Sequence, residues 1–240
     1  MQNGFKIHTV DITGSTNDDA LSCFENKSVF VAKRQTGGKG RRGRSWQSEE
    51  GNLFATVLYT ISKKDMDFIG CYSLAAAVSV GEAISVLSPS LNISYKWSND
   101  VLLNDKKVCG ILLETAEDPF RLAIGTGVNI TNHPQGLLNY EATDIHEQGA
   151  KNINRDNLLE AYLEFLDFHI KLINSGEAEK ITEKWLSKCN HLHQPIKVML
   201  ANRMVYGLFK GLDAKGNLIL SNLDELNAKD LIIPAGEVLF

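Results

Sequence analysis

The chain has 240 residues, 43% of them hydrophobic and 22% charged, a content that supports a buried core and excludes an intrinsically disordered protein. The net charge of −4 excludes a surface built throughout to hold nucleic acid, so any phosphate site must be local. Four widely spaced cysteines, with no Cys-x-x-Cys pair, exclude a disulfide framework or a cysteine-based zinc site and suggest reduced thiols.

The first half of the chain alternates between strand and helix patterns. Residues 5–10 alternate polar and apolar side chains, and Ser15 then offers a cap for a helix to about residue 25. Four glycines and no apolar periodicity predict a loop at residues 35–44. Further predicted elements are strands at 29–32 and 53–60, a core helix at 71–87, and strands at 93–97, 101–103, 108–113 and 122–130.

The second half changes character twice. Beyond residue 154 apolar residues recur at helical spacing to about residue 175, and a second helix is predicted at 177–188. Short β-rich runs then follow at 196–200, 204–212, 218–220 and 230–233. We therefore expect an α+β fold, with residues 1–190 as the main domain and residues 191–240 as a small β module.

A glycine-rich loop carries a concentrated positive charge. Residues 33–44 hold six of the 25 basic residues, while the rest of the chain is acidic. Glycines let backbone N–H groups approach anions closely, and arginines add forked, permanently charged donors. A solvated basic loop or a nucleic-acid patch would show the same charge, so the loop alone predicts only an anion site.

Four ordered motifs make this prediction more specific. The segment from Gly38 to Trp46 resembles the Gly-Arg-Gly-Arg-x-Gly-Arg-x-Trp loop of biotin–protein ligases. The other motifs that match this family are Ser15-Thr16-Asn17, Lys96-Trp97-Ser98-Asn99-Asp100 followed by Lys107 and Gly110, and Gly125-Thr126-Gly127-Val128-Asn129. The resemblance covers essentially the whole chain and implies a mixed-sheet catalytic domain, similar to that of lipoate ligases, with a C-terminal SH3-like β-barrel.

Two positions depart from the family pattern. Lys39 stands where many members have arginine, so it keeps the charge but loses the bidentate fork. Ser98 stands where the family usually has proline. Serine lacks the φ constraint of proline, so it should loosen the turn slightly without touching the chemistry.

The resemblance implies a biotin site in which donors and acceptors hold the neutral ureido ring inside an apolar pocket. Three glycines would leave room there for the ring system and the aliphatic tail. The implied biotin-binding residues are Ser15, Thr16, Asn17, Gln35, Gly38, Lys39, Gly40, Arg41, Lys107, Gly110, Gly125 and Gly127.

The resemblance also implies that ATP converts biotin to biotinyl-5′-AMP. Lys107 and Arg41 are the expected catalytic cations, which would neutralise the carboxylate and the α-phosphate. The implied ATP or adenylate contacts are Arg41, Arg44, Trp46, Asn99, Lys107 and Asn129. The metal ligands are not assigned, although Asp100 is a candidate to lie near Mg²⁺. We expect disorder in residues 36–46 when no ligand is bound.

The implied partner is a biotin carboxyl carrier protein or the carrier domain of a carboxylase, whose lysine receives the biotin. ATP, Mg²⁺ and biotin are the expected co-substrate, metal and substrate, with no tightly bound prosthetic group. The sequence shows no signal peptide and no membrane span, so we expect a cytoplasmic protein that is a monomer or a homodimer.

Two other functions remain open at this level. A lipoate or octanoyl ligase shares the sheet architecture, but the arginine-rich loop and the C-terminal β module favour biotin. A nucleic-acid-binding regulator could use the basic loop. Some family members carry an N-terminal DNA-binding domain, but here the first catalytic motif begins at Ser15, so we expect no specific DNA binding.

Overall fold

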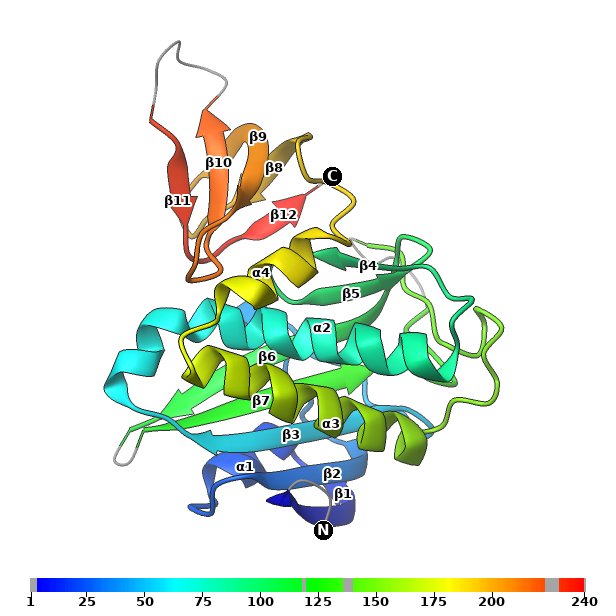
Figure 1. The fold of residues 1–240 in the computed structure, drawn as a ribbon. Coiled ribbons are helices and arrows are strands. Elements are labelled where there is room, and N and C mark those ends of the chain that lie inside the picture. Colours follow the sequence, from blue (N-terminus) through cyan, green and yellow to red (C-terminus); the bar gives the residue numbers. More distant parts are fainter. Residues whose placement is uncertain (1–3, 118–119, 136–139, 223–228, 240) are drawn as a thin grey trace.

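The computed structural model describes residues 4–117, 120–135, 140–222 and 229–239. The strands of its larger sheet are β1 (Lys6–Thr13), β2 (Ser28–Gln35), β3 (Leu53–Thr60), β4 (Ile93–Lys96), β5 (Asp100–Leu103), β6 (Lys106–Ala116) and β7 (Arg121–Val128). They lie in the order β1-β2-β3-β7-β6-β5-β4 (Figure 1). The β1–β2 pair is parallel and the other pairs are antiparallel, so the sheet is mixed as predicted.

The C-terminal strands form a second, antiparallel sheet. They are β8 (Pro195–Met199), β9 (Met204–Leu212), β10 (Leu218–Asn222), β11 (Leu231–Ile233) and β12 (Glu237–Leu239), in the order β11-β10-β9-β8-β12. The small β module is therefore confirmed, but β11 and β12 are the two edges of its sheet and do not pair with each other. Its described strands form an open sheet and not the closed barrel that we expected.

Helices cover both faces of the larger sheet. They are α1 (Thr16–Leu21), α2 (Ile69–Leu87), α3 (Arg155–Asn174) and α4 (Glu179–Leu186). Successive side chains of a strand point to opposite faces. In β3, Val57 therefore joins the main core with α2 and α3, whereas Leu58 packs with Ala20 of α1 in a separate small cluster.

The helix α2 is buried around most of its circumference, because it lies between the sheet, α3 and α4 (Figure 1). The stretch Lys63–Leu87 is long and apolar enough to cross a membrane by composition alone. Its burial inside the protein accounts for that composition, since a helix enclosed by a core is apolar on all sides.

A turn of the small sheet fastens it to the larger one. The Asp213 carboxylate accepts the backbone N–H groups of Lys215 and Asn217, which closes the turn between β9 and β10. The Trp97 indole then donates to the Gly216 carbonyl oxygen at 3.1 Å. The predicted boundary at residue 190 falls in the connection between α4 and β8.

The α+β prediction is confirmed, and the remaining differences are local. The predicted first helix ends at Leu21 instead of residue 25: Ser22 is its C-cap, and the next N–H, of Cys23, bonds three residues back to the Ala20 carbonyl oxygen instead of four. Strand β12 was not predicted, since its three residues are too few to show a period.

Candidate active site

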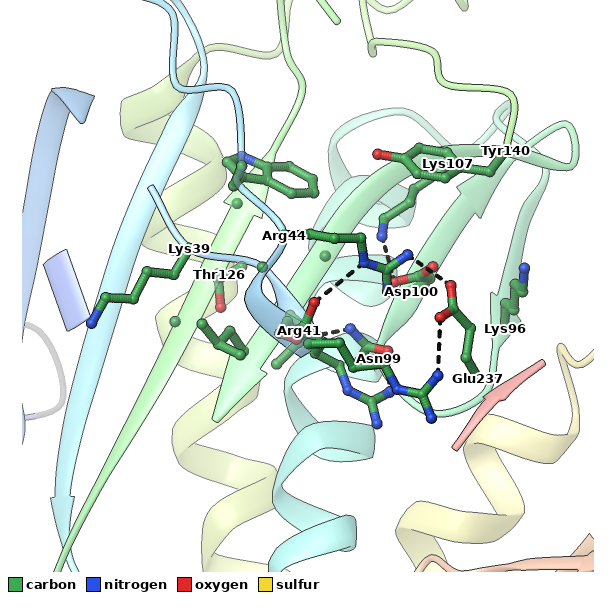
Figure 2. Close-up of a pocket in the computed structure, with 18 of the residues that line it drawn as sticks. Lys39, Arg41, Arg44, Lys96, Asn99, Asp100, Lys107, Thr126, Tyr140 and Glu237 are labelled. Carbon is green, nitrogen blue, oxygen red and sulfur yellow. Dashed lines mark hydrogen bonds and ion pairs between the residues drawn. The ribbon is translucent and has the colours of Figure 1, made fainter. Parts of the chain in front are cut away.

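A cavity of about 670 Å³ opens on the α1 side of the larger sheet, beneath the loop between β2 and β3 (Figure 2). Its walls come from motifs that are far apart in the sequence. Predicted site residues that line it are Ser15, Thr16, Asn17, Gln35, Lys39, Gly40, Arg41, Arg44, Trp46, Asn99, Asp100, Lys107, Gly110, Gly125 and Gly127. The cavity is within the size range of small-molecule sites.

Uncharged donors and acceptors form the end of the cavity beside α1, which we call the neutral end. Gln35 Oε1 accepts from the Thr16 backbone N–H at 2.9 Å and from its hydroxyl at 3.1 Å. Gln35 Nε2 donates to Ser48 Oγ at 2.9 Å. The buried Thr56 hydroxyl lies 2.8 Å from Thr16 Oγ1 and 2.7 Å from Asn17 Oδ1, to which it can donate. These bonds hold the side chains in place without a ligand.

Acidic side chains fix two further groups at the neutral end. Asn17 Nδ2 donates to Glu114 Oε2 at 2.7 Å. The Lys39 ammonium lies 2.5 Å from an Asp18 carboxylate oxygen and 3.6 Å from Glu114 Oε1. Its hydrogen bond to Asp18 raises the pKa of Lys39 above the ordinary value, so this cation is held by carboxylates on the pocket rim.

Paired glycines form the floor of the cavity. Gly110 of β6 faces Gly127 of β7, and the Trp46 ring lies against both. A Cβ atom would come within 2.8 Å of the ring at Gly110 and 2.6 Å at Gly127. At Gly125 a Cβ would come within 2.2 Å of the Asn17 amide. We expected these glycines to make room for a ligand; in the structure they make room for Trp46 and Asn17.

Lys107 lies at the start of β6, at the opposite, charged end of the cavity. Its ammonium is 2.7 Å from Asp100 Oδ1, and both side chains are largely buried. It also lies over the Trp46 ring at 5.5 Å and the Tyr140 ring at 5.0 Å from the centroids. The backbone of Lys107 bonds to Glu141 O and Thr143 N, which fixes the point from which the side chain projects.

Arg41 lies deeper and is held by the turn that follows β4. Its guanidinium donates to Ser98 Oγ at 2.7 Å and to Asn99 Oδ1 at 2.9 Å; Figure 2 labels Arg41 and Asn99. Asn99 Nδ2 in turn donates to the Ile111 carbonyl oxygen at 3.0 Å. The Trp97–Ser98 peptide bond is cis. We expected Ser98 not to touch the chemistry; its hydroxyl bonds directly to Arg41, so this expectation stays a prediction that depends on the role of Arg41.

Two other arginines tie the loop to the small sheet. Arg44 lies 2.7 Å from Glu237 Oε1 of β12, and Arg42 lies 3.7 Å from Glu237 Oε2 (Figure 2). Arg42 also donates to the Met199 carbonyl oxygen at 2.8 Å. With a bridge between Lys39 and Ser45, the loop takes up a defined conformation. The disorder expected for residues 36–46 without ligand stays a prediction for the protein in solution.

Burial changes the protonation equilibria at the charged end. It lowers the pKa of the Arg41 guanidinium and of the Lys96 ammonium, and Asp100 partly offsets both effects. Burial alone would raise the pKa of Glu237. The hydrogen bond to Arg44 and the charges of nearby cations together outweigh burial, so the net pKa is lowered. The carboxylate of Glu237 is therefore ionised at neutral pH beside Arg44.

Two predicted binding residues do not line the cavity. Gly38 is enclosed by the Trp46 carbonyl, Ser48 and Gln35, where a Cβ would meet backbone oxygen at 2.5 Å. Asn129 is buried and donates to the Thr143 carbonyl oxygen at 3.1 Å. Their expected roles toward biotin and adenine stay predictions.

Sequence reasoning missed several side chains that line the cavity or hold the residues that line it. Glu114 and Thr56 lie on strands, with no motif around them, and Tyr140 and Glu237 reach the site only through tertiary packing. Lys96 belongs to a recognised motif, but we had given it no role. The alternation of Thr56 with apolar neighbours was the one available signal, because it places a polar residue on the face opposite the core.

Comparisons with known proteins agree with this geometry. Residues 8–129 match the model of the biotin/lipoate A/B protein ligase family. The biotin–[acetyl-CoA-carboxylase] ligase of Paracoccus denitrificans is 30% identical over 95% of this chain and 98% of its own length. The chain belongs to this family. The bifunctional ligase/repressor BirA of Escherichia coli is 26% identical over 91% of this chain and 70% of its own length.

A solved structure extends the likeness to the whole fold. Biotin protein ligase from Aquifex aeolicus, in complex with biotin and ATP, superposes with a TM-score of 0.83 at 27% identity. The match covers 97% of both chains. The small C-terminal sheet is therefore part of the shared architecture.

Proposed function

We propose that this protein is an ATP-dependent biotin–protein ligase, which forms biotinyl-5′-AMP and transfers biotin to a lysine of a carrier protein. One observation carries the proposal: a single cavity joins the neutral end, with its amides and hydroxyls, to a charged end with Arg41, Arg44 and Lys107. Biotin has the same two parts, a neutral ureido ring and a carboxylate. The Paracoccus denitrificans relative is named as a biotin ligase, and the Aquifex aeolicus structure contains biotin and ATP.

The neutral end is suited to the ureido ring. Its carbonyl and N–H groups need partners once they leave water, and Thr16, Asn17 and Gln35 present hydroxyl and amide groups to the cavity. Trp46 would flank the ligand, since its indole N–H is buried and has no hydrogen-bond partner among the described residues. The aliphatic tail would then run toward the charged end beside the Trp46 ring, which covers Gly110 and Gly127.

The charged end is suited to adenylation. A biotin carboxylate oxygen bonds to the α-phosphorus of ATP while the bond from that phosphorus to pyrophosphate breaks. Arg41 and Lys107 would neutralise the approaching anions, and Arg44 would exchange Glu237 for phosphate. The carrier's neutral lysine amine next bonds to the carbonyl carbon, AMP leaves with the electron pair, and the amine gives a proton to solvent.

We also expect Mg²⁺ to accompany ATP. Asp100 presents a mostly buried carboxylate to the cavity beside Lys107. One protein carboxylate is enough for this ion, which usually keeps waters and binds mainly phosphate oxygens. The bound ion would offset phosphate charge, and Asp100 is the residue that would hold it.

The expected partner is a biotin carrier domain of a carboxylase, as the names of the relatives suggest. A cytoplasmic location and the lack of specific DNA binding stay predictions. A DNA-binding assay at several salt concentrations tests the latter: only weak, steeply salt-dependent binding is expected, and repressor-like affinity would contradict it.

The decisive experiment measures pyrophosphate release from ATP and Mg²⁺ with biotin, with lipoate, or with neither. Release with biotin alone is expected, and release only with lipoate would move the protein to the sister activity in its family. If neither biotin nor lipoate causes release, both ligase activities are contradicted. Transfer is then tested on a biotin carrier domain and on the same domain with its acceptor lysine changed to arginine, which should stay unmodified.

A further inference from the structure

A second cluster of chemically capable side chains lies outside the cavity, in the segment that follows β7. His133 Nδ1 is 2.8 Å from Asp144 Oδ2 and 3.8 Å from Glu147 Oε2. One ligand atom from each of the three residues lies within 4.8 Å of the other two. Across the described ranges, this is the only such group of three metal-ligand side chains.

The surrounding backbone and side chains hold these groups in place. Asp144 is buried, and its second oxygen accepts the Glu147 backbone N–H at 2.7 Å. The Thr143 hydroxyl donates to Glu147 Oε2 at 2.6 Å. Second-sphere hydrogen bonds of this kind orient carboxylates in metal sites. Glu147 is half exposed, so its side chain has room to adjust.

The spacing fits a small tetrahedral ion. Metal–ligand bonds of zinc near 2.1 Å place neighbouring ligand atoms about 3.4 Å apart. The two measured separations from His133 Nδ1, 2.8 and 3.8 Å, lie on either side of that value. An imidazole with two carboxylates suits Zn²⁺ and similar transition metals, whereas Mg²⁺ prefers an all-oxygen octahedron.

We propose that His133, Asp144 and Glu147 bind one divalent transition-metal ion of the Zn²⁺ class, with water completing the coordination. The neutral imidazole would coordinate through Nδ1, so its proton must move to Nε2. Gln135 Nε2 lies 2.9 Å from His133 Nε2 and would turn its amide to offer the oxygen instead. The ion thereby replaces the direct histidine–aspartate hydrogen bond.

The position of the cluster gives this ion a structural role. His133 and Asp144 stand at the two ends of a segment that carries Tyr140 over Lys107. Just before Asp144, the segment bonds to the backbone of Lys107, through Glu141 O at 2.8 Å and Thr143 N at 3.0 Å. An ion that joins the segment ends would therefore stabilise these contacts. This inference does not depend on the identity of the cavity's substrate.

Zn²⁺ titration of the metal-free full chain by calorimetry tests the proposal, with Co²⁺ absorption as a second reading of the geometry. We expect one equivalent of Zn²⁺ and an intense visible Co²⁺ band of tetrahedral type. H133A and E147Q should each weaken binding. Because loss of an outer-sphere partner alone costs about 10- to 100-fold in metal affinity, loss of the histidine should cost at least 100-fold.

The variant E141Q is the matched control, since Glu141 is exposed in the same segment and outside the cluster; it should bind like the parent. Hydrogen exchange supplies a reading independent of activity. At Zn²⁺ about 100 times its dissociation constant, exchange of the Lys107 amide should slow by up to about 100-fold in the parent and not in H133A. Binding of less than half an equivalent of Zn²⁺ would overturn the proposal. Equal binding by H133A and the parent would also overturn it, because the ion would then be held by other ligands such as the free cysteines.

Discussion

The two ends of the cavity are organised in different ways. At the neutral end, Thr16, Asn17, Gln35 and Thr56 bond mainly to one another and to uncharged neighbours. At the charged end, Lys107 and Arg44 are paired with the carboxylates of Asp100 and Glu237, which the proposed function would exchange for phosphate. The groups proposed to select biotin are therefore positioned in advance. The proposed ATP-binding cations are instead held in order by carboxylates, which can be exchanged for phosphate when ATP binds.

The largest effect is expected at the charged end. Replacing Lys107 with alanine removes the cation nearest the expected carboxylate and α-phosphate, so adenylation should slow by about 100- to 1,000-fold or more. Biotin-dependent exchange of pyrophosphate into ATP measures this rate. Lys151, which is exposed and lies outside the cavity, provides the control K151A, which should keep nearly full activity. Adenylation by K107A at the rate of the parent would contradict the proposed mechanism.

The next effect tests the preset neutral end. Thr56→Val keeps the shape of the side chain but deprives Asn17 Oδ1 of its donor, at a cost of about 1 to 3 kcal/mol. Biotin should bind roughly tenfold or more weakly by calorimetry, since 1.4 kcal/mol corresponds to a factor of ten. Thr60→Val, at an exposed position of the same strand, should bind biotin normally. Unchanged affinity in T56V would show that the hydrogen-bond chain does not order this end.

A smaller effect is expected at Ser98, where this chain departs from the family pattern. S98A removes one of the two oxygen acceptors of Arg41 and leaves Asn99 in place. A loss of about 1 kcal/mol predicts a roughly fivefold higher KM for ATP. Ser90, which is exposed and lies outside the cavity, gives the control S90A. A KM equal to that of the parent would make the Ser98 contact incidental.

The smallest effect concerns the link between the loop and the small sheet. Glu237→Gln removes a partly exposed charge pair, worth about 1 kcal/mol at neutral pH. The folded pKa of Glu237 is below its ordinary value of 4.5, so this contribution is present above that value and disappears as the pH falls through the folded pKa. Urea unfolding of both proteins from about pH 7 to about pH 3.5 should show the difference vanish in acid. A difference that persists there would rule out the charge pair as its cause.

Periodic segments could be predicted from sequence and long-range pairings could not. The strands Leu53–Thr60 and Met204–Leu212 have the predicted bounds, because their composition and turn residues are local signals. The four motifs also gave most of the cavity, including Lys107 at a strand end. Glu237 illustrates the limit: nothing in the chain distinguishes it among 29 acidic residues until β12 pairs with β8 and brings it to Arg44.

The same limit explains what was missed around Lys107 and Arg41. The turn chemistry of residues 104–106 was readable, but the return of Glu141 and Thr143 to the Lys107 backbone depends on a connection with no periodic pattern. From the sequence we considered Ser98 only for its effect on the backbone of the turn, as a replacement for proline. Its role as an acceptor follows from the loop folding over the turn, a contact between residues 57 positions apart.

The contact of Trp46 with the facing pair Gly110 and Gly127 makes these three positions an epistatic unit. A methyl group at either glycine would occupy space already taken by the indole ring, so a substitution there is tolerated only if position 46 becomes smaller or the ring moves away. Conversely, shrinking Trp46 removes the constraint on both glycines and deepens the floor. In evolution or engineering of this pocket toward a bulkier acid, a side chain at either glycine therefore requires that the tryptophan shrink or move as well.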